Sequence, residues 1–222
     1  MPLIEELIKA DKEFKQKIKI YKYPFDVAKC GMENFLTDPK SVHSLAYFYN
    51  YALSKCNFKY VMKWDGDMIL PKSMVPSFKS FIFSLKVYDE PVLGRSKGLT
   101  VYKGFDEKYY YRKNAFEEEI RVFNNVISNY FEKDILWERL RSDIKTKSIN
   151  SMENIFIEFK DVSTNEFSHW NSGDFGMGMR KRREMEDFKI ISELTSENNS
   201  EKAIKIEEYG FRIIDYEDIF NF

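Results

Sequence analysis

The segment that most constrains the fold is Val61-Met62-Lys63-Trp64-Asp65-Gly66-Asp67-Met68-Ile69-Leu70, in which two carboxylates, one glycine apart, lie between two apolar runs. This pattern predicts a strand that ends at Asp65, and residues i and i+2 of an extended segment point to the same side. Asp65 and Asp67 are therefore expected to converge. Like charges that close repel each other unless a cation lies between them, which favours a divalent metal, Mn²⁺ or Mg²⁺. The alternative is an ordinary Asp-Gly turn.

The composition indicates a globular chain of one domain. With 222 residues the chain is long enough to bury a core, and 35 basic against 36 acidic side chains give no field that would attract nucleic acid. The basic run at residues 180–183 is flanked by acids, so it is interpreted as a solvated helix face. The two cysteines have neither metal-binding nor redox spacing, which is typical of a reducing compartment. The sequence shows no apolar run of about 20 residues and no signal-peptide pattern. We therefore predict a cytoplasmic chain without a transmembrane segment.

The order of elements predicts the fold class. Helices and strands alternate in the first half, which favours parallel strands joined by crossovers, and the second half adds antiparallel pieces. We therefore expect an α/β fold, with a mixed, mainly parallel central sheet flanked by helices. Residues 1–222 form one domain, with 176–222 as a C-terminal helical extension. The helices are expected at residues 3–14, 38–55, 71–83, 180–194 and 200–208, with a helical tendency at 131–141. The strands are expected at residues 18–23, 59–64, 91–94, 98–103, 109–111, 120–123, 154–160 and 211–216.

The chain has two histidines, and His169 is the better candidate for a metal ligand. It lies in a polar segment next to Trp170, where an imidazole nitrogen could bind a cation. A capping or packing role is the alternative. His43 lies among apolar residues and is interpreted as structural.

The segment that follows a helix and Tyr49-Asn50-Tyr51-Ala52, namely Phe58-Lys59-Tyr60-Val61-Met62-Lys63-Trp64-Asp65-Gly66-Asp67, resembles the middle of a GT-A glycosyltransferase, closest to family 2. The resemblance covers residues 15–175 loosely and is specific in 45–70. It implies a nucleotide-diphospho-sugar transferase fold, with Asp65 near the ribose and metal and Asp67 coordinating the metal. His169 is the position that matches the late metal-binding histidine of several such enzymes. The chain departs from the family at its start, because a helix and residues 18–23 stand where the first strands of that fold are usual.

This resemblance implies a metal-dependent glycosyltransferase of the hexosyltransferase type, which moves a sugar from a UDP- or GDP-sugar to a hydroxyl of a glycan, lipid or protein. Arg95 and Lys97, on a glycine-flanked loop, are the candidate cations for the leaving diphosphate, although both could be solvated loop charges. Glu138, in a semi-apolar setting, and Asp134, in the region where family 2 enzymes place their base, are the candidate general bases. The alternatives are a metal-dependent nucleotidyltransferase or phosphohydrolase, and a non-catalytic sugar-binding remnant of a transferase.

Overall fold

The fold is that of a computed structural model, and the structure describes Glu6 and residues 12–164, 167, 170, 177–196 and 202–221. The helices are α2 (Lys12–Lys17), α3 (Met32–Leu36), α4 (Leu45–Ser54), the 3-10 helix η1 (Lys72–Met74), α5 (Val75–Leu85), α6 (Met179–Ser196), α7 (Lys202–Glu208) and α8 (Tyr216–Asn221). The strands are β1 (Tyr60–Met62), β2 (Met68–Ile69), β3 (Val92–Lys103), β4 (Tyr109–Arg112), β5 (Glu117–Asn124), β6 (Asn129–Lys133), β7 (Glu138–Ser142), β8 (Lys147–Asp161) and β9 (Phe211–Ile214).

The central sheet has seven strands and is mostly antiparallel, so the expected mainly parallel sheet is wrong. Strands β1, β5, β3, β4 and β9 follow one another, β8 lies on the other side of β3, and β2 pairs with β8. Among the described strands, β3 and β8 form the parallel pair, and the other pairings are antiparallel. The physical reason lies in the connections. Residues 104–108 and 113–116 are too few for a crossover, so β4 and β5 each pair with β3 in the antiparallel direction.

A second, two-stranded sheet replaces the helical tendency expected at residues 131–141. Strands β6 and β7 form an antiparallel hairpin, with Phe131 opposite Leu140. Helix α4 fixes the hairpin through Asn50, whose side-chain amide donates to the Phe131 carbonyl at 2.7 Å and accepts from the Phe131 amide at 2.8 Å. Phe131 is buried against Ala46 and Phe123. Tertiary contacts with α4 therefore decide the conformation of this segment.

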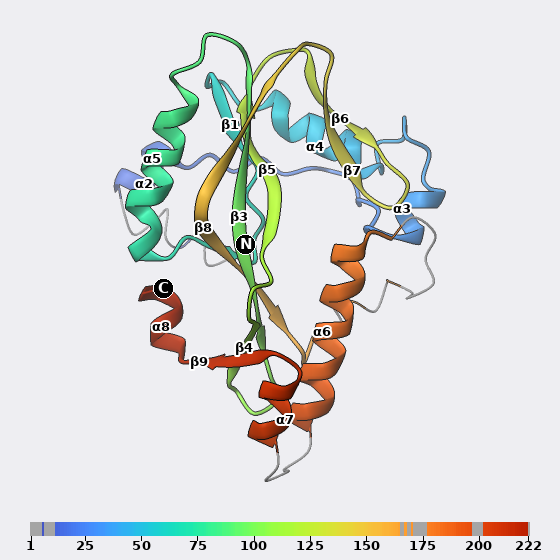
Figure 1. The fold of residues 1–222 in the computed structure, drawn as a ribbon. Helices are drawn as coiled ribbons and strands as arrows, with labels where there is room; N and C mark the ends of the chain where they lie inside the picture. The colour runs from blue at the N-terminus through green and yellow to red at the C-terminus, as the bar shows by residue number, and fades with distance from the viewer. Residues whose placement is uncertain are drawn as a thin grey trace.

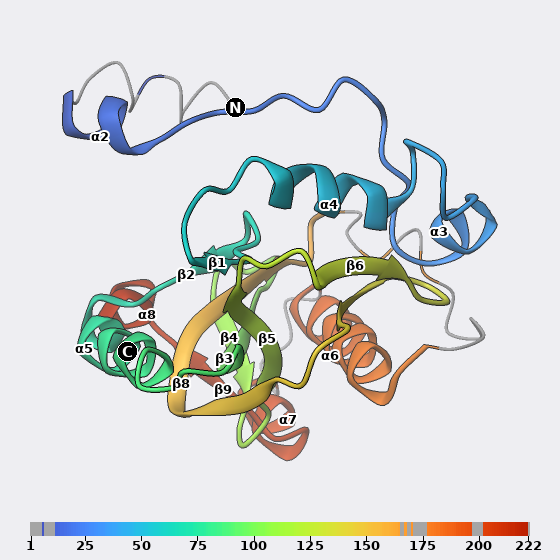
Figure 2. The same cartoon turned by 90° about the horizontal axis from the view of Figure 1, so that it is seen from above.

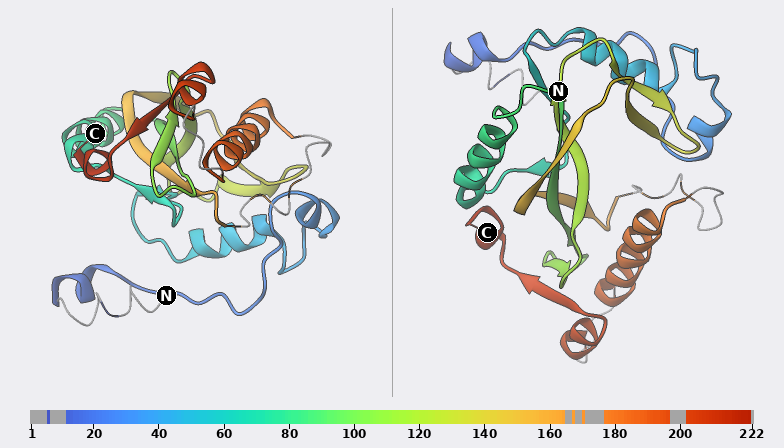
Figure 3. Two further views of the ribbon diagram at one scale, coloured as in Figure 1. Left: turned by 90° about the horizontal axis from the view of Figure 1, so that it is seen from below. Right: turned by 45° about the horizontal axis from the view of Figure 1, so that its top comes forward.

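Helices cover both faces of the central sheet (Figures 1 and 3). On one face, Phe81 and Leu85 of α5 pack against Val92, Val122 and Ile155. On the other face, Ile191 of α6 is buried with aromatic residues of β3, β4 and β9. The segment after residue 176 is more than a helical extension, because β9 pairs with β4 and contributes an edge strand to the central sheet.

The N-terminal part of the described chain lies outside this arrangement and runs along α4 (Figure 2). Residues 18–23 are not a strand. Their aromatic side chains pack on α4 instead: the Tyr23 ring lies 5.2 Å from that of Phe48, and the Tyr23 hydroxyl donates to the Val42 carbonyl at 2.5 Å. Helix α4 begins at Leu45 rather than near Asp38, since the Asp38 carboxylate accepts the Lys40 amide and closes a local turn that does not continue into the helix.

Candidate functional site: a charged cleft between the sheet and helix α6

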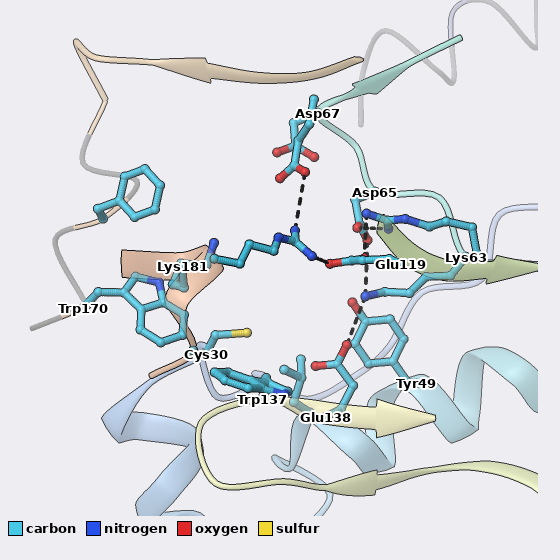
Figure 4. Close-up of a pocket in the computed structure, with 16 residues that line it drawn as sticks. Cys30, Tyr49, Lys63, Asp65, Asp67, Glu119, Trp137, Glu138, Trp170 and Lys181 are labelled. Atoms are coloured by element: carbon cyan, nitrogen blue, oxygen red, sulfur yellow. Dashed lines mark hydrogen bonds and ion pairs between the residues drawn. The ribbon is translucent and has the colours of Figure 1, made fainter. Parts of the chain in front are cut away.

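A cleft of about 510 Å³ lies where the β1–β2 connection, the β6–β7 hairpin and the N-terminal end of α6 meet (Figure 4). Strands β5 and β8 form its floor, and α4 contributes Tyr49. Its walls combine acidic, basic and aromatic side chains, a mixture typical of sites that bind polar ligands with flat rings. It is lined by Cys30, Leu45, Tyr49, Lys63, Asp65, Asp67, Glu119, Arg121, Trp137, Glu138, Glu158, Phe167, Trp170, Gly178, Arg180 and Lys181.

Asp65 and Asp67 both open into this cleft, in the turn that joins β1 to β2. Each of the two half-exposed carboxylates has a cationic partner from the sheet. Arg121 donates to Asp65 at 2.6 Å, and Lys160 donates to Asp67 at 2.7 Å. The Asp-Gly turn was the alternative to a metal site in the sequence interpretation, which did not anticipate the internal cations. The repulsion between the two carboxylates is thus already offset by the protein itself.

The residues present fit a hard divalent cation in their donor chemistry. Mg²⁺ commonly binds one or two carboxylates together with phosphate oxygens of the substrate, and Asp65 and Asp67 supply two. Within the described ranges, no group of three His, Cys, Asp or Glu side chains is arranged to hold a metal. A third acidic side chain is nearby: Oε2 of Glu158, in the same cleft, is buried without a hydrogen-bond partner. The arrangement therefore suits a two-carboxylate site that is completed by ligand oxygens.

The floor of the cleft owes its charges to strand alternation. Glu158 and Lys160 are two residues apart on β8 and so face the same side, while Glu119 and Arg121 of β5 both line the cleft beside a register shift between β3 and β5. The guanidinium of Arg121 is only 1% exposed, and its Nη2 donates to Glu119 at 2.7 Å. A buried guanidinium needs such partners, because an unpaired charge in this position would be very costly.

Helix α6 closes the network from the opposite side. Arg180 forms an ion pair with Glu119 and donates to Glu184 at 2.9 Å, while Lys181 contacts Glu184 at 2.5 Å. Burial opposes ionisation of Glu119, but the guanidinium groups of Arg180 and Arg121 outweigh it and lower the pKa of that carboxyl to about 2. Glu119 therefore stays charged and ties α6 to the sheet.

The hairpin wall contains Glu138, whose pKa is shifted in the opposite direction from that of Glu119. Burial raises the pKa of Glu138 above its ordinary value, although the Lys63 ammonium, 3.0 Å away, works against this shift. Lys63 also lies 4.7 Å from the centre of the Tyr49 ring and 3.9 Å from Asp65. Figure 4 shows Lys63 between Asp65 and Glu138. Glu138 is thus a nearly buried carboxyl at the cleft surface, and among the described residues Lys63 is its cationic partner.

Four aromatic side chains form the remaining walls of the cleft: Tyr49, Trp137, Phe167 and Trp170. The Lys181 ammonium lies 5.3 Å from the ring centre of Phe167 and 5.6 Å from that of Trp170, within the range of cation–π attraction. Trp170 and Lys181 face Asp65 and Lys63 across the cleft in Figure 4. Such rings offer flat apolar surfaces beside charged groups.

The other residues proposed from the sequence have different positions. Asp134 lies in the β6–β7 turn, where its carboxylate accepts the Ile135 amide at 2.9 Å and pairs with Arg139 at 2.5 Å. Arg95 and Lys97 are on β3 rather than on a loop: Arg95 donates to Ser148 at 3.3 Å, and Lys97 lies over the Phe116 ring at 5.2 Å. His169 lies outside the described residues. The structure therefore brings together Asp65, Asp67 and Glu138.

The cleft also contains charges that the sequence interpretation missed. The basic run at residues 180–183 is exposed only at Arg182, and Arg180 and Lys181 line the cleft. The signal that could have found Glu158 and Lys160 is their spacing. They alternate with Ile157 and Phe159 in a strand that was predicted, and charges at alternate positions of a buried strand need a polar partner.

Gly98 of β3 leaves the space for the ring on which Arg121 stacks. Arg121 stacks on the Phe156 ring at 5.1 Å, and that ring occupies the space over Gly98 of β3. A Cβ atom built at Gly98 would lie 2.1 Å from the Phe156 ring, which is far closer than atoms can approach. Gly98 is therefore required for the packing of Phe156, and through it for the position of Arg121.

Comparison of the chain with models of protein families, with curated proteins and with solved structures found no match. Across the described part of the chain, the helices are too short or too polar to cross a membrane. Any assignment of function therefore rests on the chemistry of the cleft.

Proposed function

We propose that this chain is a metal-dependent glycosyltransferase that uses a nucleotide-diphosphate sugar, with the cleft as its active site. One observation carries the proposal: Asp65 and Asp67 open into the same cleft as Glu138, a buried carboxyl with a raised pKa. Sugar transfer needs both kinds of group, since a charged leaving diphosphate must be stabilised and an acceptor hydroxyl must lose its proton.

The donor would bind between the sheet and α6. A divalent cation on Asp65 and Asp67, Mn²⁺ or Mg²⁺, would supply Lewis acidity toward the leaving diphosphate. Arg180 and Lys181, at the beginning of α6, take the role that the sequence interpretation gave to Arg95 and Lys97, because they are the cationic side chains on the wall opposite the two aspartates. The aromatic rings beside Lys181 offer surfaces on which a nucleobase or a sugar can stack.

Glu138 is the general base in this proposal. Its pKa lies above that of an ordinary glutamate, which brings it closer to the range in which a carboxylate accepts a proton efficiently. Lys63 keeps the carboxylate ionised and oriented at 3.0 Å. Asp134 is a weaker candidate, because Arg139 and a backbone amide already occupy its carboxylate.

The test is titration calorimetry of the full chain with UDP and with GDP, in the presence and absence of Mn²⁺. Asp67→Asn should reduce Mn²⁺-dependent nucleotide binding by at least about tenfold, since it removes a charged metal ligand. The matched control is Asp143→Asn, on a carboxylate of the hairpin that contacts Tyr130 at 3.1 Å. If Asp67→Asn binds nucleotide and Mn²⁺ as the wild type does, the proposed site is wrong.

A second candidate function is a binding module without catalysis. The observation that favours it is that Asp65, Asp67 and Glu119 all have cationic partners within the protein. The same titrations, combined with an assay of sugar transfer or hydrolysis, separate the two functions. Nucleotide-sugar binding without turnover would favour the binding module, and hydrolysis of the nucleotide-sugar to a nucleoside monophosphate and a sugar phosphate would favour a phosphohydrolase.

A further inference from the structure

Asp67 is paired with the ammonium of Lys160, whereas Asp65 is paired with the guanidinium of Arg121. Lys160 is 4% exposed on β8, and its Nζ contacts Asp67 Oδ2 and Glu158 Oε1, each at 2.7 Å. The ammonium thus bridges a half-exposed carboxylate of the cleft and a buried one of the floor. Both of these acidic residues line the cleft, so the ammonium contacts the lining of the space in which a ligand would bind.

Arg121 differs from Lys160 in how firmly it is fixed. Its planar guanidinium binds Asp65 and Glu119 with two different nitrogens and stacks on Phe156. Movement away from Asp65 would disrupt all three contacts together. A lysine ammonium is a compact charge on a flexible stem, so it can leave one carboxylate and keep another. For Lys160, the carboxylate that it can keep is Glu158.

We propose that Lys160 is the resident counter-ion of Asp67, which a divalent cation must displace, and that the diphosphate of the donor assists this displacement. This inference rests on the proposed function. A divalent cation bound to Asp67 would lie within a few ångströms of the ammonium, where the two like charges repel strongly. Metal alone is therefore expected to bind weakly.

The donor changes this balance because it brings negative charge. A diphosphate beside Asp67 attracts the ammonium and the metal together, so that the repulsion between them is offset. Metal and nucleoside diphosphate should consequently each increase the affinity of the other by the same factor. Lys160 thereby makes a productive cation site depend on the presence of the donor.

The experiment measures Mn²⁺ binding by the electron paramagnetic resonance signal of free Mn²⁺, first without nucleotide and then with UDP or GDP. The chains compared are the wild type, Lys160→Met, Lys160→Arg and the control Lys103→Met, which removes a lysine from an ion pair with Glu107 at the far end of β3. Lys160→Met should bind Mn²⁺ alone roughly tenfold tighter or more, and should gain less affinity when nucleotide is added. Lys103→Met should behave as the wild type, and Lys160→Arg, which keeps the charge but holds its carboxylates more firmly, should bind Mn²⁺ alone no more tightly than the wild type.

A merely structural lysine would not produce these opposite shifts, since damage to the site weakens both measurements. Equal or weaker binding of Mn²⁺ alone by Lys160→Met, with metal-dependent nucleotide binding intact in the wild type, overturns this inference and leaves the proposed function standing. A wild type that binds neither Mn²⁺ nor Mn²⁺-nucleotide overturns the proposed function itself.

Loss of the buried ammonium takes the nearest cation from Asp67 and leaves Glu158 with Arg180, whose Nη2 is 3.9 Å from Glu158 Oε2, so Lys160→Met could fail to fold. The double variant Lys160→Met with Glu158→Gln keeps the local charge balance and should show the same tighter binding of Mn²⁺ alone. The wild type provides an independent measurement: if nucleoside diphosphate does not increase its affinity for Mn²⁺, the inference is wrong.

Discussion

Glu119 and Glu138 line one cleft, Glu119 from the central sheet and Glu138 from the hairpin, yet their pKa values move in opposite directions. Glu119, on the sheet wall, has guanidinium partners from Arg121 and Arg180, and its pKa falls to about 2. Glu138, on the hairpin wall, has Lys63 as its cationic partner, and burial raises its pKa. The comparison teaches that two guanidinium partners outweigh desolvation at Glu119, whereas at the less exposed Glu138 desolvation outweighs one ammonium.

The two walls consequently have different roles in the proposed enzyme. The sheet wall contains a closed set of ion pairs that joins β5, β8 and α6, and its groups gain little from exchanging protons. On the hairpin wall, Glu138 has Lys63 as its cationic partner, and its raised pKa makes it the carboxyl group suited to acid–base chemistry. Each of the following variants tests one side of this contrast.

The largest effect is expected from Glu138→Gln, which removes the proton acceptor. Sugar transfer should slow by about 10²–10⁴-fold, the usual contribution of a general base, while nucleotide binding measured by calorimetry changes little. In the wild type, the rate should fall as the pH drops through the raised pKa of Glu138, because the protonated carboxyl cannot accept a proton. Asp134→Asn is the matched control and should keep the wild-type rate. If sugar transfer is slow in Asp134→Asn and unchanged in Glu138→Gln, then Asp134 and not Glu138 is the general base.

The next effect concerns the sheet wall. Arg121→Met removes a guanidinium that is 1% exposed and leaves Asp65 and Glu119 with one cation fewer. Breaking a buried ion pair in this way typically costs about 3–5 kcal/mol, so the free energy of unfolding in urea should fall by an amount of that order. Arg121→Lys should recover only part of it, because an ammonium cannot reproduce the two-pronged contact. A loss comparable to that of a surface ion pair would show that the sheet wall is not structural.

The smallest effect is a change in how the stability of the fold depends on pH when Glu119 is replaced. The pKa of Glu119 is about 2 in the folded chain against an ordinary value of 4.5, so its ionisation stabilises the fold above the higher value. This stabilisation is lost as the pH falls from about 4.5 through 2. In Glu119→Gln the contribution is absent, and urea midpoints measured across this range should fall less steeply with acid. Equal slopes in the two chains would contradict the lowered pKa.

The sequence predicted individual elements better than their arrangement. Strands near residues 120–123 and 154–160 and the helix at 180–194 are confirmed. In the strand at 154–160, apolar and charged residues alternate from Ile157 to Lys160, which is a strong local signal. The sheet direction was wrong, since helix–strand alternation was given more weight than the short connections around β4. The hairpin at 129–142 was missed because Asn50, far away in the sequence, supplies the hydrogen bonds that fix it.

The candidate site was predictable where the pattern is local. Asp65-Gly66-Asp67 and Glu138 could be selected from their neighbours in the sequence, and the structure brings them to one cleft. Lys160 and Arg180 could not, because their importance depends on pairing between distant segments. Arg95 and Lys97 were selected on the assumption that glycines mark a loop, whereas Gly94 and Gly98 lie inside β3, where larger side chains would collide with the packed core.

Gly98 has a consequence for how variants of this protein would be interpreted. It is not among the residues that line the cleft and carries no functional group, yet the ring of Phe156 fills the place of its missing side chain, and Arg121 stacks on that ring. In a survey of every single substitution, position 98 should therefore be as intolerant as the charged residues of the cleft. The positions that such a survey finds sensitive would therefore include a glycine in the middle of a strand that has no chemical role of its own.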